Sequence, residues 1–290
     1  MNVLVQSLIG GILIGGLYAA MAVGVSLVWG ALRLINLALL GVTLVGGYLT
    51  YDLTVSAGWD PLVTVLVVVP VLGLLSYALQ WLFDAMHLDE FQSLLVTFGV
   101  LTIAIAGINM RWSADFRQIP RQLNPYVATS IRFGGFAFPV ALLIAFLAAL
   151  VLSIAIHLFL QRSMFGKAVR AVAQDRQMAE VLGVNYRSLS RSLSGAAGAV
   201  SALAGVFVVI VQALYPTLPL EWLGIVFSVV ILGGIGSALG SFMAGLIIGA
   251  VGAVAAVLIG AAAAPLATFL VLIFTLLLRP QGLFGSEVGT

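Results

Sequence analysis

Seven long stretches without a charged side chain make up most of this 290-residue sequence. They comprise residues 1–32, 34–51, 61–83, 91–110, 133–161, 192–220 and 222–278. Because a helix needs about 20 mainly apolar residues to cross a bilayer, the pattern predicts an all-α, polytopic transmembrane helical bundle. The lengths accommodate about eight to ten membrane segments.

The first and the last of these stretches do not fit simple crossings. Residues 1–32 would form a straight helix of about 48 Å, against a bilayer core of about 30 Å. We therefore expect this segment to bend, tilt or re-enter the membrane. The 57 residues 222–278 must hold more than two crossings, or two crossings and a half-helix.

Composition excludes most other classes of protein. Apolar residues make up 62% of the chain and charged residues 8%, against about 45–50% and about 25% in soluble domains. So few charges fit neither a water-soluble globule nor a disordered chain, and residues 1–290 are expected to form one transmembrane domain. The net charge of only +2 gives no sign of nucleic-acid binding, and the absence of cysteine excludes disulfides and thiol chemistry.

Basic residues give the expected orientation of the chain. The loop 161–191 carries six of the 12 basic residues, which places it in the cytoplasm by the positive-inside rule. Arg33 and Arg279 fit the same side. Because both ends of the segment 192–278 then lie in the cytoplasm, it must hold an even number of crossings, and it has room for four. Residues 84–90 would then lie inside, and residues 54–60 and 111–132 outside. The segment 111–132 fits this topology least well because it carries four arginines.

The motifs of catalysis and of energy coupling are missing from the sequence. It has neither a Gly-x-Ser-x-Gly elbow nor a His-Glu-x-x-His motif, and the pair Gly166-Lys167 lacks the rest of a phosphate-binding P-loop. An intramembrane enzyme is therefore disfavoured. The acidic residues Asp52, Asp60, Asp84 and Glu221 all lie at the ends of the apolar stretches, whereas proton- or ion-coupled carriers usually keep such residues inside. We therefore expect a partner to supply the energy for transport. The alternative, a secondary transporter or channel, would need an ion site of carbonyl and hydroxyl oxygens in 222–240.

One segment of the cytoplasmic loop favours a helix. From Lys167 to Leu182 the sequence has no glycine or proline and consists mostly of strong helix formers. This predicts one short helix that ends at Gly183 in a left-handed conformation. Small residues, among them Ala171 and Ala179, share one face of the helix. Such a face suits docking into a groove of a partner, and a helix lying on lipid headgroups is the alternative.

At these residues the chain resembles a known family. The segment Gly166-Lys-Ala-Val-Arg-Ala-Val-Ala-Gln-Asp-Arg-Gln-Met-Ala-Glu-Val-Leu-Gly-Val184 is similar to the coupling loop of permeases in bacterial branched-chain amino acid ABC importers. Other similar segments are Leu32-Arg-Leu-Ile-Asn-Leu-Ala38, Leu94-Leu-Val-Thr-Phe-Gly99, Val230-Ile-Leu-Gly-Gly-Ile-Gly-Ser237 and Leu278-Arg-Pro-Gln-Gly-Leu-Phe-Gly285. The likeness is closer to the H-type permease than to its longer M-type partner. After Ala38, where the family usually has a His-Gly-type polar pair, this chain has Leu39-Leu40.

The resemblance implies a membrane-spanning permease subunit that works with partners. These are a second related permease, two cytoplasmic ATPases that use ATP, and a periplasmic or lipid-tethered binding protein that delivers the substrate. The implied location is the inner (plasma) membrane of a bacterium, and the chain itself is expected to bind no cofactor or metal. Branched-chain or other small neutral amino acids are the implied substrates, with urea or short amides as alternatives. The residues implied to couple to the ATPases are Gly166, Arg170, Ala171, Asp175, Ala179, Glu180 and Gly183.

Neutral polar residues and glycines in the membrane stretches are candidates for the translocation path. The predicted set is Asn36, Thr97, Gly99, Gly233, Gly234, Gly236 and Ser237. A neutral path of this kind suits a zwitterion or another small polar solute. The spaced glycine pairs Gly11/Gly15, Gly236/Gly240 and Gly245/Gly249 are expected to serve helix packing.

Overall fold

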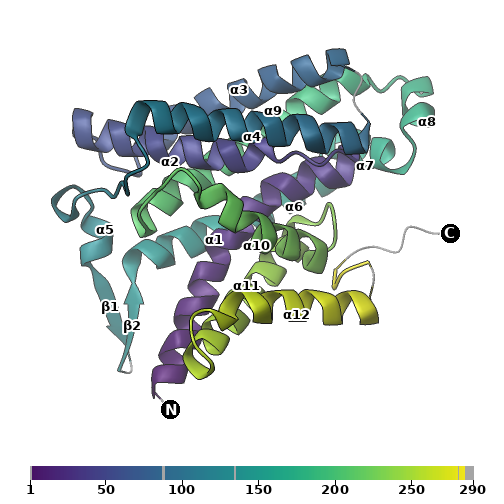
Figure 1. Ribbon diagram of the computed structural model, residues 1–290. Coiled ribbons are helices and arrows are strands. Elements are labelled where there is room, and N and C mark those ends of the chain that lie inside the picture. Colours follow the sequence, from purple (N-terminus) through teal and green to yellow (C-terminus); the bar gives the residue numbers. More distant parts are fainter. Residues whose placement is uncertain (1, 87–88, 134, 280, 285–290) are drawn as a thin grey trace.

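The chain folds into a bundle of helices (Figure 1), and the computed structural model describes residues 2–86, 89–133, 135–279 and 281–284. Within these ranges seven helices are long and apolar enough to cross a membrane. They are α1 (Asn2–Leu32), α2 (Ala38–Ala57), α3 (Val65–Met86), α4 (Glu90–Trp112), α6 (Val140–Arg162), α9 (Tyr186–Val211) and α11 (Ala238–Leu258). Two shorter apolar helices, α10 (Leu218–Gly233) and α12 (Ala263–Leu278), have 16 residues each. The seven long helices confirm the predicted all-α, polytopic bundle.

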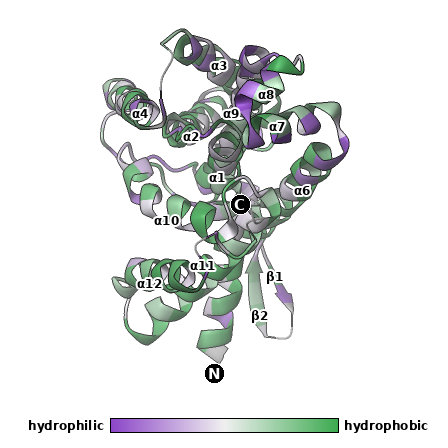
Figure 2. Cartoon of the chain, turned by 90° about the vertical axis from the view of Figure 1, so that its right-hand side faces the viewer, coloured by the Kyte–Doolittle hydropathy of each residue, from purple (hydrophilic) through white to green (hydrophobic). Residues whose placement is uncertain are grey.

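One end of the bundle carries two short helices, α7 (Met164–Gln174) and α8 (Arg176–Val181); we call it the α7–α8 end. The C-terminal end of α1 reaches it, because the Arg33 guanidinium donates to the Ala173 carbonyl oxygen at 3.2 Å. The C-terminal end of α3 reaches it as well, through an ion pair between Asp84 and Arg191. Hydrophilic residues gather in α7, α8 and the start of α9 (Figure 2).

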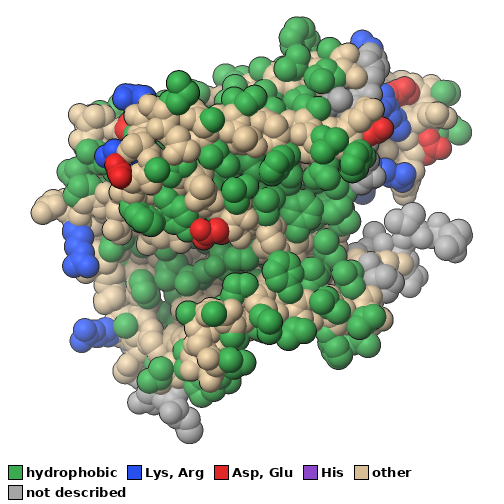
Figure 3. Space-filling view, viewed as in Figure 1, with side chains coloured by type: hydrophobic (Ala, Val, Ile, Leu, Met, Phe, Trp, Pro, Cys, Tyr) green, Lys and Arg blue, Asp and Glu red, His purple; other side chains and the backbone are tan. Residues whose placement is uncertain are grey.

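The opposite end, the hairpin end, holds the long connection between α4 and α6. There the Tyr126 hydroxyl donates to the Asp60 carboxylate at 2.9 Å, and the backbones of Arg117 and Leu214 pair as a β-bridge. Residues 54–60 and 111–132 therefore lie at the end opposite to 161–191, as the sequence predicts. Lys and Arg side chains gather towards the two ends, and hydrophobic side chains cover much of the middle (Figure 3).

The connection at the hairpin end contains structure that the sequence reasoning did not predict. A 3-10 turn (η1, Arg121–Leu123) and a short helix (α5, Pro125–Ala128) precede an antiparallel hairpin of β1 (Ser130–Phe133) and β2 (Phe136–Pro139). Gly135 permits the tight turn because its φ is +86°. The Gln6 amide completes the hairpin: it donates to the Ala137 carbonyl oxygen and accepts from the Ala137 N–H. The start of α1 thus supplies the hydrogen bonds that β2 would otherwise lack.

Helix α1 is one continuous helix of 31 residues, so the alternative of a re-entrant segment is wrong. Its middle is enclosed, since Ala19, Ala22 and Val23 are completely buried. An unbroken helix is the form that satisfies every backbone group in such a setting. Figure 1 shows α1 crossing the bundle obliquely to α2, α3 and α4, which fits the expected tilt.

The contact between α1 and α11 depends on glycine. A Cβ atom on Gly11 would lie 2.5 Å from the Gly249 carbonyl oxygen, and one on Gly15 would collide with the Gly245 carbonyl oxygen. Small residues of this kind let two membrane helices approach backbone to backbone. The predicted packing role of the pairs Gly11/Gly15 and Gly245/Gly249 is therefore confirmed.

Candidate coupling site and translocation path

The segment predicted to form one helix from Lys167 to Leu182 is instead two helices, α7 and α8, separated at Asp175. This residue leaves the helical conformation, with φ −148° and ψ 108°, and its carboxylate accepts from the Met178 N–H at 3.0 Å. Aspartate is among the best N-cap residues, and this local bond competes with continuation of the helix. The prediction of one helix is wrong because the capping bond at Asp175 outweighs the helix propensity of the residues around it.

The end of α8 agrees with the prediction. Gly183 has φ +92°, and the Val184 N–H donates to the Ala179 carbonyl oxygen at 3.0 Å. This bond to the fifth residue back is that of a Schellman motif, which requires a left-handed residue at the position of Gly183. The chain can then turn directly into α9, whose first turn is capped by the Asn185 side chain.

The inner sides of α7 and α8 pack on the bundle. Gly166, Val169, Val172 and Ala179 are buried, and Ala179 is only 2% exposed. The expectation that Ala179 lies on a free docking face is therefore wrong: its methyl group contacts this chain's own core. Ala171 is half-buried, and Gly166 leaves no room for a side chain beside the Leu160 backbone.

The outer side of this helix pair is exposed and partly apolar. Arg170, Asp175, Glu180 and Gly183 of the predicted coupling residues lie on it. With them lie three apolar side chains that no part of the described chain covers: Met178, Val181 and Leu182, with exposed fractions of 57%, 82% and 77%. We call these three residues the α8 patch.

Cationic side chains hold α7 and α8 against the bundle. Arg33 binds a carbonyl oxygen in the last turn of α7, where a positive charge also meets the negative end of the helix dipole. The Arg176 guanidinium lies 3.6 Å from the centre of the Tyr186 ring and 3.1 Å from Glu180. Helix α7 is therefore bound to the end of α1, and helix α8 to the start of α9.

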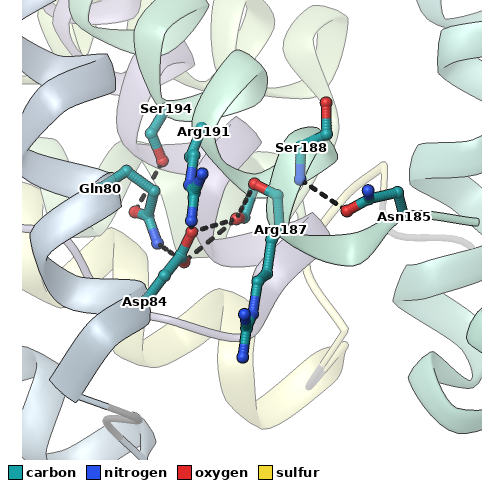
Figure 4. Close-up of polar contacts among 8 residues, drawn as sticks. Gln80, Asp84, Asn185, Arg187, Ser188, Arg191 and Ser194 are labelled. Atoms are coloured by element: carbon teal, nitrogen blue, oxygen red, sulfur yellow. Dashed lines mark hydrogen bonds and ion pairs between the residues drawn. The ribbon is translucent and has the colours of Figure 1, made fainter.

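Near the contact between Arg176 and Tyr186, a polar network joins the end of α3 to the start of α9 (Figure 4). The Asp84 carboxylate, with only 6% of its side chain exposed, accepts from Arg191 Nε at 2.8 Å. It also accepts from the Ser190 hydroxyl at 3.1 Å and the Gln80 amide at 2.9 Å. The Gln80 carbonyl oxygen in turn accepts from the Ser194 hydroxyl at 2.8 Å. A buried carboxylate is tolerated here because several donors replace its water.

The contacts of this network repeat along both helices. Asp84 meets Ser190 and Gln80 meets Ser194, and one turn further a Cβ on Gly198 would collide with Ser76. Each step is four residues forward on one helix and four back on the other, as in antiparallel packing along one face. Sequence reasoning missed this site, although polar residues one turn apart near the end of each apolar helix were a visible signal.

Two of the predicted path residues lie together in a cavity of about 160 Å³ at the α7–α8 end. Asn36 and Thr97 line it, along with Gln80 and Asp84 of the network and Arg176 of α8. The Thr97 oxygen accepts from the Leu37 N–H at 3.1 Å, and Asn36 accepts from the Ala38 N–H. Both side chains thus also fix the turn between α1 and α2.

The structure separates the remaining predicted path residues from this cavity. Gly233, Gly234, Gly236 and Ser237 form the close turn between α10 and α11, where the Gly236 N–H donates to the Ser26 hydroxyl. Ser26 and the cavity residue Val28 point about 200° apart around α1. Helix α1 therefore lies between the cavity and the turn that joins α10 to α11. A Cβ atom added to Gly99 would meet nothing within 4 Å, and Gly99 does not line the cavity.

These features define a polytopic α-helical membrane protein with an exposed pair of helices at one end. The chain belongs to the family described as branched-chain amino acid transport system / permease component, whose sequence model matches residues 7–279. It is therefore a transport subunit.

Relatives match over nearly the full length. The high-affinity branched-chain amino acid transport system permease protein BraD of Pseudomonas aeruginosa is 26% identical, over 97% of this chain and 95% of its own. LivH of Salmonella typhimurium, of the same description, is 25% identical with the same coverage. The probable branched-chain amino acid transport permease protein LivH of Methanocaldococcus jannaschii is 24% identical, over 96% and 91%. No solved structure matches this chain.

Proposed function

We propose that this chain is the permease subunit of an ATP-driven importer and that α7 and α8 receive the force of a cytoplasmic ATPase. The observation that carries the proposal is the α8 patch. Its apolar side chains lie outside the membrane helices, where exposure to water is unfavourable. Because the inner side of the same helix is already buried, a partner protein is the surface that would cover the patch.

The charges around the patch suit a protein partner. Arg170 and Lys167 on α7, and Asp175 and Glu180 on α8, are all exposed and can form charge-assisted hydrogen bonds that set the register of docking. A helix lying on lipid headgroups would instead place cations beside its apolar face. On α8 the one cation, Arg176, is paired with Glu180 at 3.1 Å, so the helix offers lipid phosphates no uncompensated positive charge.

Motion of the two helices would reach the membrane helices by two routes. Arg33 links α7 to the end of α1, and the short turn after α8 leads directly into α9, whose first two turns hold the Asp84 network. A docked ATPase that moves α8 would thus displace α9 against α3. The chain would need no ATP site of its own.

The substrates we propose are branched-chain or other small neutral amino acids. The names of the relatives support this class, as do the neutral polar residues Asn36 and Thr97 in the cavity. A second permease, two ATPases and a substrate-binding protein in or at the bacterial inner membrane complete the proposed importer. Urea or short amides are alternative substrates, and a stand-alone carrier or channel is the alternative class.

The test is to make the α8 patch polar. We expect the double variant Val181→Glu/Leu182→Glu to reach the membrane at the wild-type level, because neither side chain is buried, and to lose both ATPase co-purification and uptake. Ile131→Glu, which changes an apolar residue 52% exposed at the hairpin end, should keep both. Leu182→Trp separates protein from lipid, since a lipid-bound helix would gain affinity whereas an ATPase groove would clash. Normal co-purification and uptake in the double variant would contradict the proposal.

A further inference from the structure

Glu221 is the only charged residue between Arg191 and Arg279. It lies in the first turn of α10 and is exposed. Glu221 is therefore an isolated charge between two uncharged stretches of the sequence.

The carboxylate is fixed in place by a tyrosine at the hairpin end. The Tyr215 hydroxyl donates to Glu221 Oε2 at 2.6 Å. Burial raises the pKa of Tyr215 to about 12, and the hydrogen bond and negative charge of Glu221 add to the shift. At neutral pH the Tyr215 hydroxyl therefore keeps its proton and can donate it to the carboxylate.

No cation within the described ranges neutralises this carboxylate, since the ion pairs there join Arg176 to Glu180 and Arg191 to Asp84. Arg117 lies near in the fold, because its backbone pairs with that of Leu214. Its guanidinium, however, donates to the Trp112 carbonyl oxygen at 2.9 Å. Among the described residues Glu221 thus has no cationic partner.

The tyrosine that holds the carboxylate belongs to an aromatic pair. The Tyr215 ring meets the Phe116 ring edge to face, with centroids 5.0 Å apart, and Phe116 is 74% exposed. A carboxylate and exposed aromatic rings in one neighbourhood can bind an ammonium group, through charge and through cation–π attraction. The hairpin end is opposite to the proposed ATPase site, and is therefore where an imported molecule would arrive.

We propose that Glu221, Tyr215 and Phe116 bind the primary ammonium group of the amino acid as it enters the permease. The proposal rests on the function proposed above and adds to it a residue that distinguishes ammonium-bearing substrates from urea and amides. A phosphatidylethanolamine headgroup carries the same ammonium chemistry, so lipid composition is one arm of the test. A cation of the second permease is the competing occupant.

The test uses the complete importer reconstituted in vesicles with a saturating amount of binding protein. Isoamylamine, which carries the ammonium and a branched apolar group, serves as an inhibitor of uptake, and isoamyl alcohol as its neutral counterpart. Glu221→Gln keeps the size and the oxygen that accepts from Tyr215. Asp115→Asn removes an exposed carboxylate from the same end and is the control. Amine binding to the binding protein affects all variants equally, so differences between them report on the permease.

We expect Glu221→Gln to raise the half-inhibitory concentration of the amine about tenfold, as loss of one charge-assisted bond predicts, and to reduce amino acid uptake. Asp115→Asn and the alcohol should show no such difference. The result should hold in vesicles of phosphatidylcholine and phosphatidylglycerol; an effect confined to phosphatidylethanolamine vesicles would overturn the substrate assignment in favour of lipid. Loss of the second permease from purified Glu221→Gln would overturn it in favour of an inter-subunit ion pair.

The two proposals fail in different ways. If the wild-type importer takes up amino acids and the Glu221→Gln importer is inhibited like wild type, the ammonium site is wrong and the proposed function stands. If the wild-type importer takes up no amino acid, both are wrong.

Discussion

Two helix pairs in this bundle pack in the same antiparallel four-residue rhythm but are held by different chemistry. Between α1 and α11, Gly11 and Gly15 lie against the backbone of Gly249 and Gly245. Between α3 and α9, contact begins with glycine at Gly198 and becomes a chain of hydrogen bonds that ends in a buried ion pair. The polar part lies at the α7–α8 end.

The difference indicates which helices of the bundle can move against each other. Two helices in backbone contact, such as α1 and α11, cannot slide gradually past each other. Any shift along the helix axis would move a side chain into the place of a glycine. Hydrogen bonds between side chains can break and re-form with new partners. We therefore expect α1 and α11 to move as one unit, and the hydrogen-bonded first turns of α9 to shift against the end of α3 when α8 is displaced.

The largest expected effect comes from filling the glycine contact. Gly15→Leu places a side chain where the Gly245 carbonyl oxygen already lies, and we expect a cost of about 3 kcal/mol or more, with loss of folded protein from the membrane. Gly10→Leu is the control, because nothing lies within 4 Å of a Cβ at that position of the same helix. The measurement is the amount of each variant that elutes as a monodisperse peak in detergent. Equal recovery of the two would show that the α1–α11 contact is not as close as described.

A smaller but still large effect is expected from Asp84→Asn. Removing one partner leaves the Arg191 charge, 23% exposed, without its counterion, which should cost about 3 kcal/mol and lower the melting temperature in detergent. Adding Arg191→Gln should recover part of the loss, since no charge then remains unpaired. The exposed pair offers the contrast: Glu180→Gln should change stability by less than about 1 kcal/mol. A double variant as unstable as the sum of its singles would mean that the two side chains act independently.

The smallest effects should differ in sign between two neighbouring contacts of α3 and α9. Ser194→Ala leaves the Gln80 carbonyl oxygen, in a side chain only 2% exposed, without its donor, and should cost about 1–2 kcal/mol. The buried Ser76 hydroxyl has no partner among the described residues, so Ser76→Ala should be neutral or stabilising by up to about 1 kcal/mol. Melting temperatures of the two variants decide this. Equal destabilisation by both would contradict the assignment of hydrogen bonds along this face.

The sequence predicts the membrane helices well because each needs only its own apolar residues. Local signals also predict that residues 54–60 and 111–132 lie at the end opposite to 161–191. They likewise predict the left-handed turn at Gly183. The break at Asp175 was missed because a single capping bond outweighed the helix propensity of the residues around it. The hairpin at 130–139 was missed because Gln6, far away in the sequence, completes its hydrogen bonding.

The polar network is hardest to predict because it depends on register between helices. Gln80 and Asp84 are recognisable as a pair on one face, and so are Ser190 and Ser194, but nothing local says that the two pairs meet. For the same reason Ala179 was assigned to a docking face: which side of a short helix packs on the bundle depends on the turn at Asp175. Patterns along one helix predict a face, and contacts between helices decide what that face touches.

The most direct test of the account is transport by purified components in vesicles. The central claim is that this chain moves its substrate only when ATPases act on α7 and α8. Vesicles that contain this chain, its second permease and the binding protein should show no uptake of a branched-chain amino acid, and uptake should begin when both ATPases and ATP are supplied. Uptake by the permease alone, driven by a substrate or ion gradient without ATPases, would contradict the account and identify the chain as a self-sufficient carrier.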